Sequence, residues 1–372
     1  MSESPERIEG CVEHADPAVV PSRFYRREDD GRVVCEMCPR ACRLGEGQRG
    51  VCFVRACRDG QVVLTSYGRS TGFCIDPIEK KPLFHFLPGT PVLSFGTAGC
   101  NLTCKFCQNW ETSRARDVER MSEAASPEAI ARAAVKSGCR SVAMTYNDPV
   151  VFFEYAVDVA EACRRVGVHT VAVTAGYMMP APREAFYRHI DAANVDLKAF
   201  SQRFYREMSG GDLNRVLDTL VYLRSSTEVW LEITTLLIPG ENDSEREIDE
   251  MTRWIFANLG TDVPLHFSAF HPDFRLQGHP ATPLSTLQRA RGIALGNGLA
   301  HVYIGNAHDD DGSATFCAGC GSRLVARIGY QISDWAMTDA GTCPSCGKAC
   351  AGVFDGKPGR WGNRRLPIAI GR

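Results

Sequence analysis

The sequence predicts an α/β fold: a partial (β/α) TIM-like barrel with a small Cys-rich module on either side of it. Two observations predict this fold. From Pro91 onward, short apolar segments alternate with helical segments at a period of roughly 35 residues, which is typical of βαβ units with parallel strands. Before and after this region, the alternation stops and cysteines cluster. A doubly wound parallel sheet made of the same units is the alternative.

The chain of 372 residues divides into four expected parts. They are a flexible leader over 1–30, a Cys-rich module with a connector over 31–90, the barrel over 91–308, and a second Cys-rich module with a tail over 309–372. The leader is polar and charged, so it offers little apolar surface to bury. In the connector, a strand is expected over 62–67. Two prolines and four charges predict an extended, non-helical path over 76–82.

The barrel strands are expected where short apolar runs are bounded by turn residues. These runs cover 91–95, 141–146, 169–174, 193–199, 230–238, 265–270 and 301–304. Helices are expected between them, over 126–137, 150–166, 181–189, 213–224, 244–258 and 285–295. Their ends carry capping signals: Ser126 precedes Pro127 at the first helix, Gly138 ends that helix, and Ser244 begins another.

Composition narrows the classes of function. Hydrophobic residues make up 44% of the chain, charged residues make up 23%, and the formal net charge is −2. This balance gives no reason to expect a nucleic-acid or membrane partner. The sequence has neither a long apolar run nor an apolar signal segment near its start, so we expect a cytoplasmic location. In that reducing compartment, clusters among the seventeen cysteines are more typical of metal binding than of disulfides.

The most informative motif is C-x3-C-x2-C, formed by Cys100, Cys104 and Cys107 directly after the first barrel strand. Three thiolates can hold three corners of a 4Fe–4S cluster and leave the fourth iron open for a substrate or cofactor. A cluster built for electron transfer usually has four cysteine ligands. Gly96 and Gly99 would let the backbone wrap closely around such a core. A zinc site or a coincidental grouping is the alternative.

Two further groups of cysteines have the spacing of metal ligands. Cys317, Cys320, Cys343 and Cys346 form two CxxC knuckles, each followed by glycine, which predicts a closed, zinc-ribbon-like structural site. Cys35, Cys38, Cys42 and Cys52 are spaced C-x2-C-x3-C-x9-C and predict zinc or a second iron–sulfur cluster. Spacing does not separate these two metals, and of the two we favour the structural, zinc-like role.

Polar residues gather where the predicted strands end. Functional groups of parallel α/β folds lie at the carboxyl ends of strands, so we expect these residues to share one face with the cysteine loop. They are Asn147 and Asp148, Gly176, Asp196 and Lys198, the segment 239–243, and His271. Asp148 could instead cap the following helix, and Asp196 and Lys198 could form a buried ion pair. His266 and His271 are candidate substrate contacts or proton carriers, although histidines at such positions are more often structural.

The chain resembles radical S-adenosylmethionine (SAM) enzymes, and most of all the radical SAM enzyme of the AmmeMemoRadiSam system, a relative of pyruvate formate-lyase activating enzymes. The resemblance runs from about Cys35 to Phe354. The motifs that carry it lie at 38–50, 76–85, 100–110, 195–200 and 266–272.

The resemblance implies a 4Fe–4S cluster on Cys100, Cys104 and Cys107 that binds SAM and cleaves it to a 5′-deoxyadenosyl radical, which abstracts hydrogen from a substrate. It places the SAM amino group near Asn147 and Asp148. Asp148 stands where these relatives carry Glu. The resemblance also implies SAM contacts for Phe106, Gly176, Asp196, Lys198, Ile238, Pro239 and His271.

Two other functions fit parts of the sequence: a non-catalytic iron–sulfur scaffold of a multiprotein system, and an RNA-modifying radical enzyme that uses the basic tail. The resemblance implies a flavodoxin or ferredoxin-type electron donor, and Memo-like and AMMECR1-like proteins as partners. It does not name the substrate.

Overall fold

The computed structural model describes residues 16–115 and 123–370. Its centre is a sheet in which seven neighbouring strands run parallel, in the order in which they occur along the chain. They are β8 (Pro91–Gly96), β10 (Ser141–Met144), β11 (His169–Thr174), β12 (Ala192–Asp196), β13 (Trp230–Leu237), β14 (Leu265–Ala269) and β15 (Val302–Gly305). This sequential parallel order is that of a partial (β/α) barrel, and a doubly wound sheet would reverse its order partway. The predicted fold class is confirmed.

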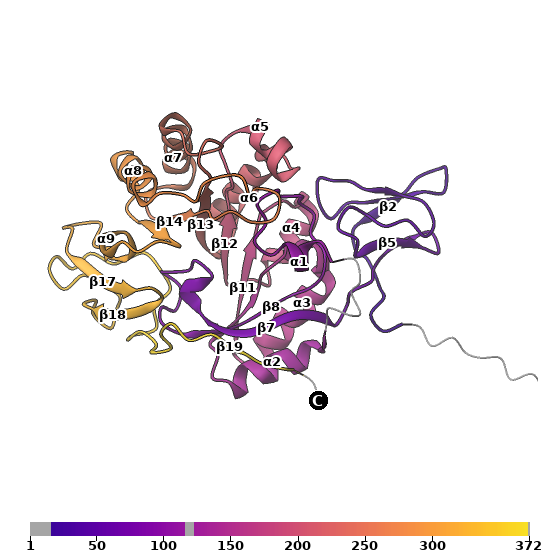
Figure 1. Cartoon of the computed structure of the whole chain (residues 1–372). Helices are drawn as coiled ribbons and strands as arrows, with labels where there is room; N and C mark the ends of the chain where they lie inside the picture. The colour runs from indigo at the N-terminus through magenta and orange to yellow at the C-terminus, as the bar shows by residue number, and fades with distance from the viewer. Residues whose placement is uncertain (1–15, 116–122, 371–372) are drawn as a thin grey trace, which may run out of the picture.

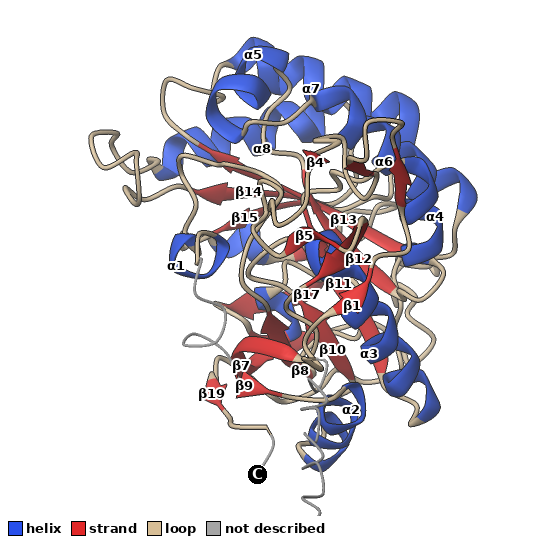
Figure 2. Ribbon diagram, turned by 90° about the vertical axis from the view of Figure 1, so that its right-hand side faces the viewer, coloured by secondary structure: helices blue, strands red, loops and turns tan. Residues whose placement is uncertain are grey.

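The helices that connect these strands lie along one side of the curved sheet, from α2 at the bottom of Figure 2 to α7 at its top. They are α2 (Pro127–Lys136), α3 (Phe153–Arg165), α4 (Pro180–Tyr187), α6 (Leu213–Ser226), α7 (Glu245–Leu259) and α8 (Leu284–Gly296). The expected caps are present: the Ser126 hydroxyl accepts from the Ala129 backbone amide, and the Ser244 hydroxyl accepts from the Glu247 backbone amide. The helix expected over 150–166 begins instead as a 3₁₀ turn, η2 (Pro149–Phe152), before α3.

The far edge of the sheet differs from the prediction. Strand β7 (Arg69–Pro77) runs antiparallel to β8, and it pairs in turn with β9 (Glu123–Ala124) and with β19 (Leu366–Pro367) near the end of the chain. The segment 76–82 was expected to be extended, yet Ile78–Lys80 forms a 3₁₀ turn, η1, directly after β7. Lys81 donates to the buried Asp76 carboxylate at 2.8 Å, so this turn folds back on the strand it follows.

The N-terminal module lies beside the barrel, at the right of Figure 1. It consists of β1 (Val20–Pro21), β2 (Tyr25–Arg27), β3 (Val33–Cys35), β4 (Arg43–Leu44), β5 (Arg55–Arg58) and β6 (Gln61–Leu64). Part of the expected flexible leader belongs to it, because β1 pairs with β6 and β2 with β3. Residues 1–15 of that leader lie outside the described residues. A buried ion pair of 2.7 Å between Arg55 and Glu154 of α3 joins the module to the barrel.

The C-terminal module lies at the opposite side of the barrel, at the left of Figure 1. After α9 (Asp310–Ser313) it forms the antiparallel strands β16 (Thr315–Phe316), β17 (Arg323–Ile328) and β18 (Gln331–Trp335) around a small core of its own. Arg327 ties it to the barrel by donating to the Phe84 carbonyl at 3.0 Å. Within the described part of the chain, none of the helices has the length and apolar character needed to cross a bilayer.

Candidate active site

The predicted cysteine motif lies on a loop that leaves β8 at its carboxyl end. Cys104 is buried, and Cys100 and Cys107 are half-buried. The loop is fixed by the π-helical turn η3 (Tyr205–Ser209): the Thr103 amide donates to the Ser209 carbonyl at 2.8 Å, and the Lys105 amide donates to the Met208 carbonyl at 2.9 Å. Backbone hydrogen bonds of this kind hold the loop in place and leave its cysteine side chains free to bind a cofactor.

Gly99 lets this loop pack against the N-terminal module. Its φ of +86° is in the left-handed region, and a Cβ atom there would stand 2.1 Å from the Cys52 carbonyl oxygen. The loop and the N-terminal module are therefore in direct backbone contact beside Cys100.

Asn147 and Asp148 follow β10 and shape the cysteine loop from the neighbouring strand. The side chain of Asn147 donates from Nδ2 to the Gly99 carbonyl at 2.7 Å, and its Oδ1 accepts from the Thr97 backbone amide at 3.1 Å. The buried Asp148 carboxylate caps η2 through the Val150 amide and also accepts from the Ala175 amide at 2.8 Å. The capping role considered for Asp148 is therefore present in the structure.

Asp196 ends β12 and Lys198 lies two residues later in the loop, and their side chains lie on the same side, as predicted. The Lys198 ammonium donates to Asp196 at 2.8 Å and lies 5.9 Å from the centre of the Phe106 ring. Burial opposes the charge on Lys198, but the Asp196 carboxylate and the nearby Cys104 thiol raise its pKa. Phe106 itself is buried and packs against Phe204, with ring centres 5.6 Å apart. A fixed cation therefore lies beside the cysteine loop.

The other predicted residues lie around this centre at different depths. Gly176 is buried after β11, where its φ of +65° and the Val195 side chain leave little room for a Cβ atom. Ile238 is buried after β13 and Pro239 is half-buried beside it. His271 is exposed on the loop after β14. The Asn242 side chain donates to the Lys198 carbonyl at 2.7 Å, which joins the β13 loop to Lys198.

His266 lies away from this centre and is structural. It is buried in β14, where its Nε2 lies 2.7 Å from the Glu232 carboxylate. Glu232 also accepts from the amides of Phe84 and His85. His266 thus helps to hold the segment after β7 in place, as the structural alternative predicts.

Burial disfavours free thiolates on the loop. Burial and the nearby Asp148 carboxylate raise the pKa of Cys100 to about 12, and burial raises the pKa of Cys104 against the opposing effect of Lys198. A metal that binds these thiols would compensate for this cost. Among residues 16–115 and 123–370, the groups whose ligand atoms all lie within 4.8 Å of one another do not include these three thiols. The loop therefore lacks the dimensions of a single-ion site, whereas thiolates on different irons of a 4Fe–4S core stand farther apart.

The four C-terminal cysteines have a tighter geometry. Their Sγ atoms all lie within 4.8 Å of one another, with 3.5 Å between Cys317 and Cys346 and 3.7 Å between Cys320 and Cys343. Tetrahedral zinc with Zn–S bonds of about 2.3 Å places its thiolates roughly 3.8 Å apart. The predicted pairing of the two knuckles is therefore formed, at the dimensions of a single-ion site.

The second close group is His85, His301 and Cys350. His85 is fully buried, and its two ring nitrogens already face the Ala351 carbonyl and the Tyr303 hydroxyl. Burial, with the neighbouring His301, lowers the pKa of His85 to about 3, so its ring is neutral. These contacts give the group a structural role between the barrel and the C-terminal module.

The motifs did not reveal several residues that position the cysteine loop. Arg40 donates from Nε to the Asn101 carbonyl at 2.9 Å, and Ser113 lies 3.2 Å from the Cys107 sulfur. Arg40 belongs to the motif 38–50, but its reach to the loop depends on how the N-terminal module packs. The π-helical turn η3 carries no sequence signal that we recognise.

Comparisons with known proteins agree with this geometry. A model of the radical SAM superfamily matches residues 95–252. The uncharacterized protein MJ0808 of Methanocaldococcus jannaschii is 38% identical over 326 residues, which cover 87% of this chain and 97% of that protein. The pyruvate formate-lyase 1-activating enzyme of Escherichia coli (strain K12) is 23% identical over 230 residues, which cover 55% and 89%.

Among solved structures, a radical SAM methyltransferase from Sphaerobacter thermophilus superposes with a TM-score of 0.48 at 15% identity and covers 82% of this chain and 81% of that one. The parallel sheet with a three-cysteine loop after its first strand defines the class, a radical SAM domain. The chain belongs to the radical SAM superfamily, in one family with MJ0808 and with homology to pyruvate formate-lyase activating enzymes.

Proposed function

We propose that this chain is an enzyme that reductively cleaves SAM to a 5′-deoxyadenosyl radical and methionine, and that the radical abstracts hydrogen from a substrate. The observation that supports this proposal most directly is the loop of Cys100, Cys104 and Cys107 at the carboxyl end of β8, beside the Asp196–Lys198 pair. A 4Fe–4S cluster with three protein ligands would supply the electron and an open iron for SAM.

The residues around the loop have separate tasks in this proposal. Asp196 and Lys198 would orient the polar groups of SAM, because both present charge beside Cys104. Asp148 would accept from the amino group of SAM at Oδ1, where the Val150 amide is its one donor among the described residues, because the Thr174 hydroxyl and the Ala175 amide already donate to Oδ2. Asn147 would keep the loop in shape. Gly176, Ile238 and Pro239 would line the adenosine, Phe106 would contact its base, and His271 would face the substrate side.

In this proposal the partners follow the motif resemblance: a flavodoxin or ferredoxin-type protein donates the electron, and Memo-like and AMMECR1-like proteins belong to the same system. The C-terminal knuckles would hold one structural zinc ion, for which the Sγ separations of 3.5 and 3.7 Å are the support.

The test is anaerobic turnover. Protein reconstituted with iron and sulfide and then reduced with dithionite should convert SAM to 5′-deoxyadenosine and methionine. Cys104→Ala should abolish the product, and Cys139→Ala, which removes a buried thiol of another region, should leave it unchanged. If the wild-type protein carries the cluster but makes no 5′-deoxyadenosine, the chain is an iron–sulfur scaffold and the proposed activity is wrong.

A further inference from the structure

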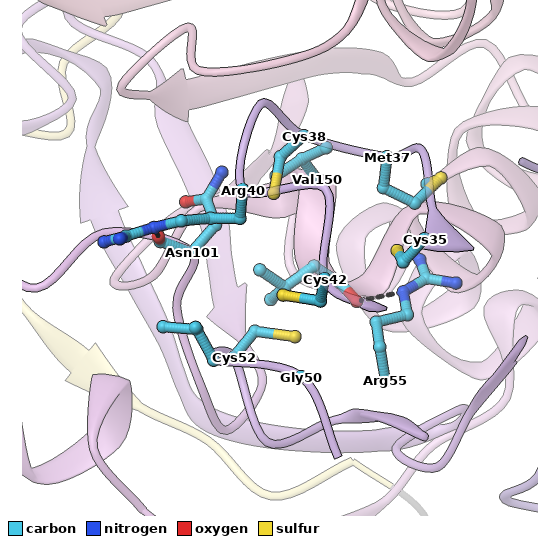
Figure 3. Close-up of a pocket in the computed structure, with 12 residues that line it drawn as sticks. Cys35, Met37, Cys38, Arg40, Cys42, Gly50, Cys52, Arg55, Asn101 and Val150 are labelled. Atoms are coloured by element: carbon cyan, nitrogen blue, oxygen red, sulfur yellow. Dashed lines mark hydrogen bonds between the residues drawn. The ribbon is translucent and has the colours of Figure 1, made fainter. Parts of the chain in front are cut away.

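The four cysteines of the N-terminal module line a single cavity. Cys35 ends β3, Cys38 lies in the following turn, Cys42 precedes β4, and Cys52 precedes β5. Figure 3 shows these four side chains around one space, with Arg40 and Arg55 on opposite sides of it. The stretch 35–42 and the loop at Cys52 have thus brought four thiols to one cavity.

The spacing of these thiols differs from that of the C-terminal knuckles. In the C-terminal module, all four Sγ atoms lie within 4.8 Å of one another. Within residues 16–115 and 123–370, no three of the N-terminal thiols satisfy the same limit. Thiolates that share one zinc ion must stand roughly 3.8 Å apart, whereas thiolates on different irons of a larger core stand farther apart. The N-terminal thiols are therefore spaced more widely than the C-terminal four, which have the dimensions of a single-ion site.

The surroundings of the cavity suit a buried anionic group. The Arg40 Nη2 atom is buried, with no hydrogen-bond partner among the described residues. The Arg55 guanidinium is buried and ion-paired with Glu154 at 2.7 Å. Four thiolates with their metal carry net negative charge, which Arg40 would offset from the wall of the cavity.

We propose that Cys35, Cys38, Cys42 and Cys52 bind a second 4Fe–4S cluster, and that this cluster has no open iron because all four of its irons have protein ligands. This assignment replaces the zinc-like role that the spacing in the sequence favoured. It distinguishes the site chemically from the loop after β8, where three cysteines leave one iron for SAM. The proposal stands independently of the proposed SAM cleavage.

The two cluster sites share a wall. Asn101, next to Cys100, lines the N-terminal cavity, and its carbonyl accepts from Arg40 at 2.9 Å. The Cys52 carbonyl oxygen packs onto Gly99, on the other side of Cys100. Loss of the second cluster should therefore disturb the cysteine loop only through these contacts. Each site can be tested separately, with variants of its own cysteines.

The experiment measures iron, sulfide and zinc in the full-length protein after anaerobic reconstitution. The wild type should hold about eight iron and eight sulfide ions per chain. The variant Cys100→Ala/Cys104→Ala/Cys107→Ala should keep about four of each, with the Mössbauer spectrum of a 4Fe–4S cluster. The variant Cys38→Ala/Cys42→Ala should also keep about four, and it should still cleave SAM if the proposed function is correct. Cys139→Ala/Cys163→Ala is the control and should keep about eight.

A triple variant that holds no iron would overturn the proposal, and so would a wild type with about four iron and two zinc ions per chain. If Cys38→Ala/Cys42→Ala does not fold, the iron content and spectrum of the triple variant decide the question alone. Failure of SAM cleavage in a wild type with about eight iron ions would reject the proposed function and leave the second cluster intact.

Discussion

Lys198 donates a hydrogen bond of 2.8 Å to Asp196, which is the last residue of β12 and lies two residues before it. The pair lies at the carboxyl end of β12, beside the buried Cys104. The chain beyond the strand keeps the two side chains on one side, and their opposite charges hold each other in one orientation. The centre thus has a fixed charged pair next to the loop that is expected to carry the cluster.

Lys198→Ala should weaken SAM binding by about tenfold or more, because a hydrogen bond that involves a charged group contributes about 1.5–3 kcal/mol. The measurement is the KM for SAM in 5′-deoxyadenosine formation, together with iron content. Lys136→Ala on the exposed face of α2 is the matched control. An unchanged KM in the Lys198 variant would mean that the pair is only structural.

Gly99→Ala should destabilise the protein by about 1–3 kcal/mol more than Gly138→Ala. Both glycines have a positive φ, +86° and +67°, so both substitutions strain the backbone. Only at Gly99 would the new Cβ atom meet another group, the Cys52 carbonyl at 2.1 Å, whereas Gly138 has nothing within 4 Å. Thermal unfolding and iron content of the two variants test this difference. Equal effects would show that the contact is easily relieved.

Glu79 predicts a pH dependence of stability. Its carboxyl group is buried, accepts from the Gly89 amide at 2.6 Å, and has its pKa raised by burial from 4.5 to about 7. Because the folded-state pKa is above the unfolded one, the stabilisation is full below about pH 4.5 and is lost as the pH rises through about 7. The loss amounts to about 3 kcal/mol at most.

Glu79→Gln removes the titrating group and should flatten this dependence. Urea unfolding at several pH values between 5 and 8 compares it with the wild type, and Glu128→Gln on the surface of α2 serves as control. A wild-type slope that survives in the Glu79 variant would assign the effect to other groups.

Cys320→Ala/Cys346→Ala should remove one zinc ion per chain without removing iron, because the C-terminal thiols are separate from both other cysteine groups. Metal analysis after dialysis measures both ions. Cys350→Ser, which alters a thiol of the same module outside the four, should retain the zinc. Retention of zinc by the double variant would contradict the proposed ribbon.

The barrel could be predicted from the sequence because its signals are local. The apolar run before the cysteine loop, predicted over 91–95, forms β8 (Pro91–Gly96), and the helix predicted over 126–137 forms α2 (Pro127–Lys136) between its Ser126 cap and Gly138. The strands expected over 141–146 and 193–199 are shorter in the structure, because Tyr146 and Lys198 already belong to the loops that carry functional groups.

Features that depend on distant pairing could not be predicted. Strand β19 has only two residues, and its existence depends on the free edge of β7 far earlier in the chain. The strands β1 and β2 lie in the segment that the sequence predicts to be a flexible leader. They are only two and three residues long, and their partners β6 and β3 order them. In the candidate site, the cysteines and Asp196–Lys198 could be named from their motifs. The contact of Arg40 with Asn101 depends on packing between modules.

The contact between Gly99 and Cys52 has a consequence for any attempt to trim the protein. A shortened version that starts at β7 would retain every barrel strand and all three cysteines of the loop, yet it would leave the backbone beside Cys100 exposed to water. We therefore expect the minimal unit that keeps water from this loop to include the N-terminal module, although none of that module's strands belongs to the barrel sheet.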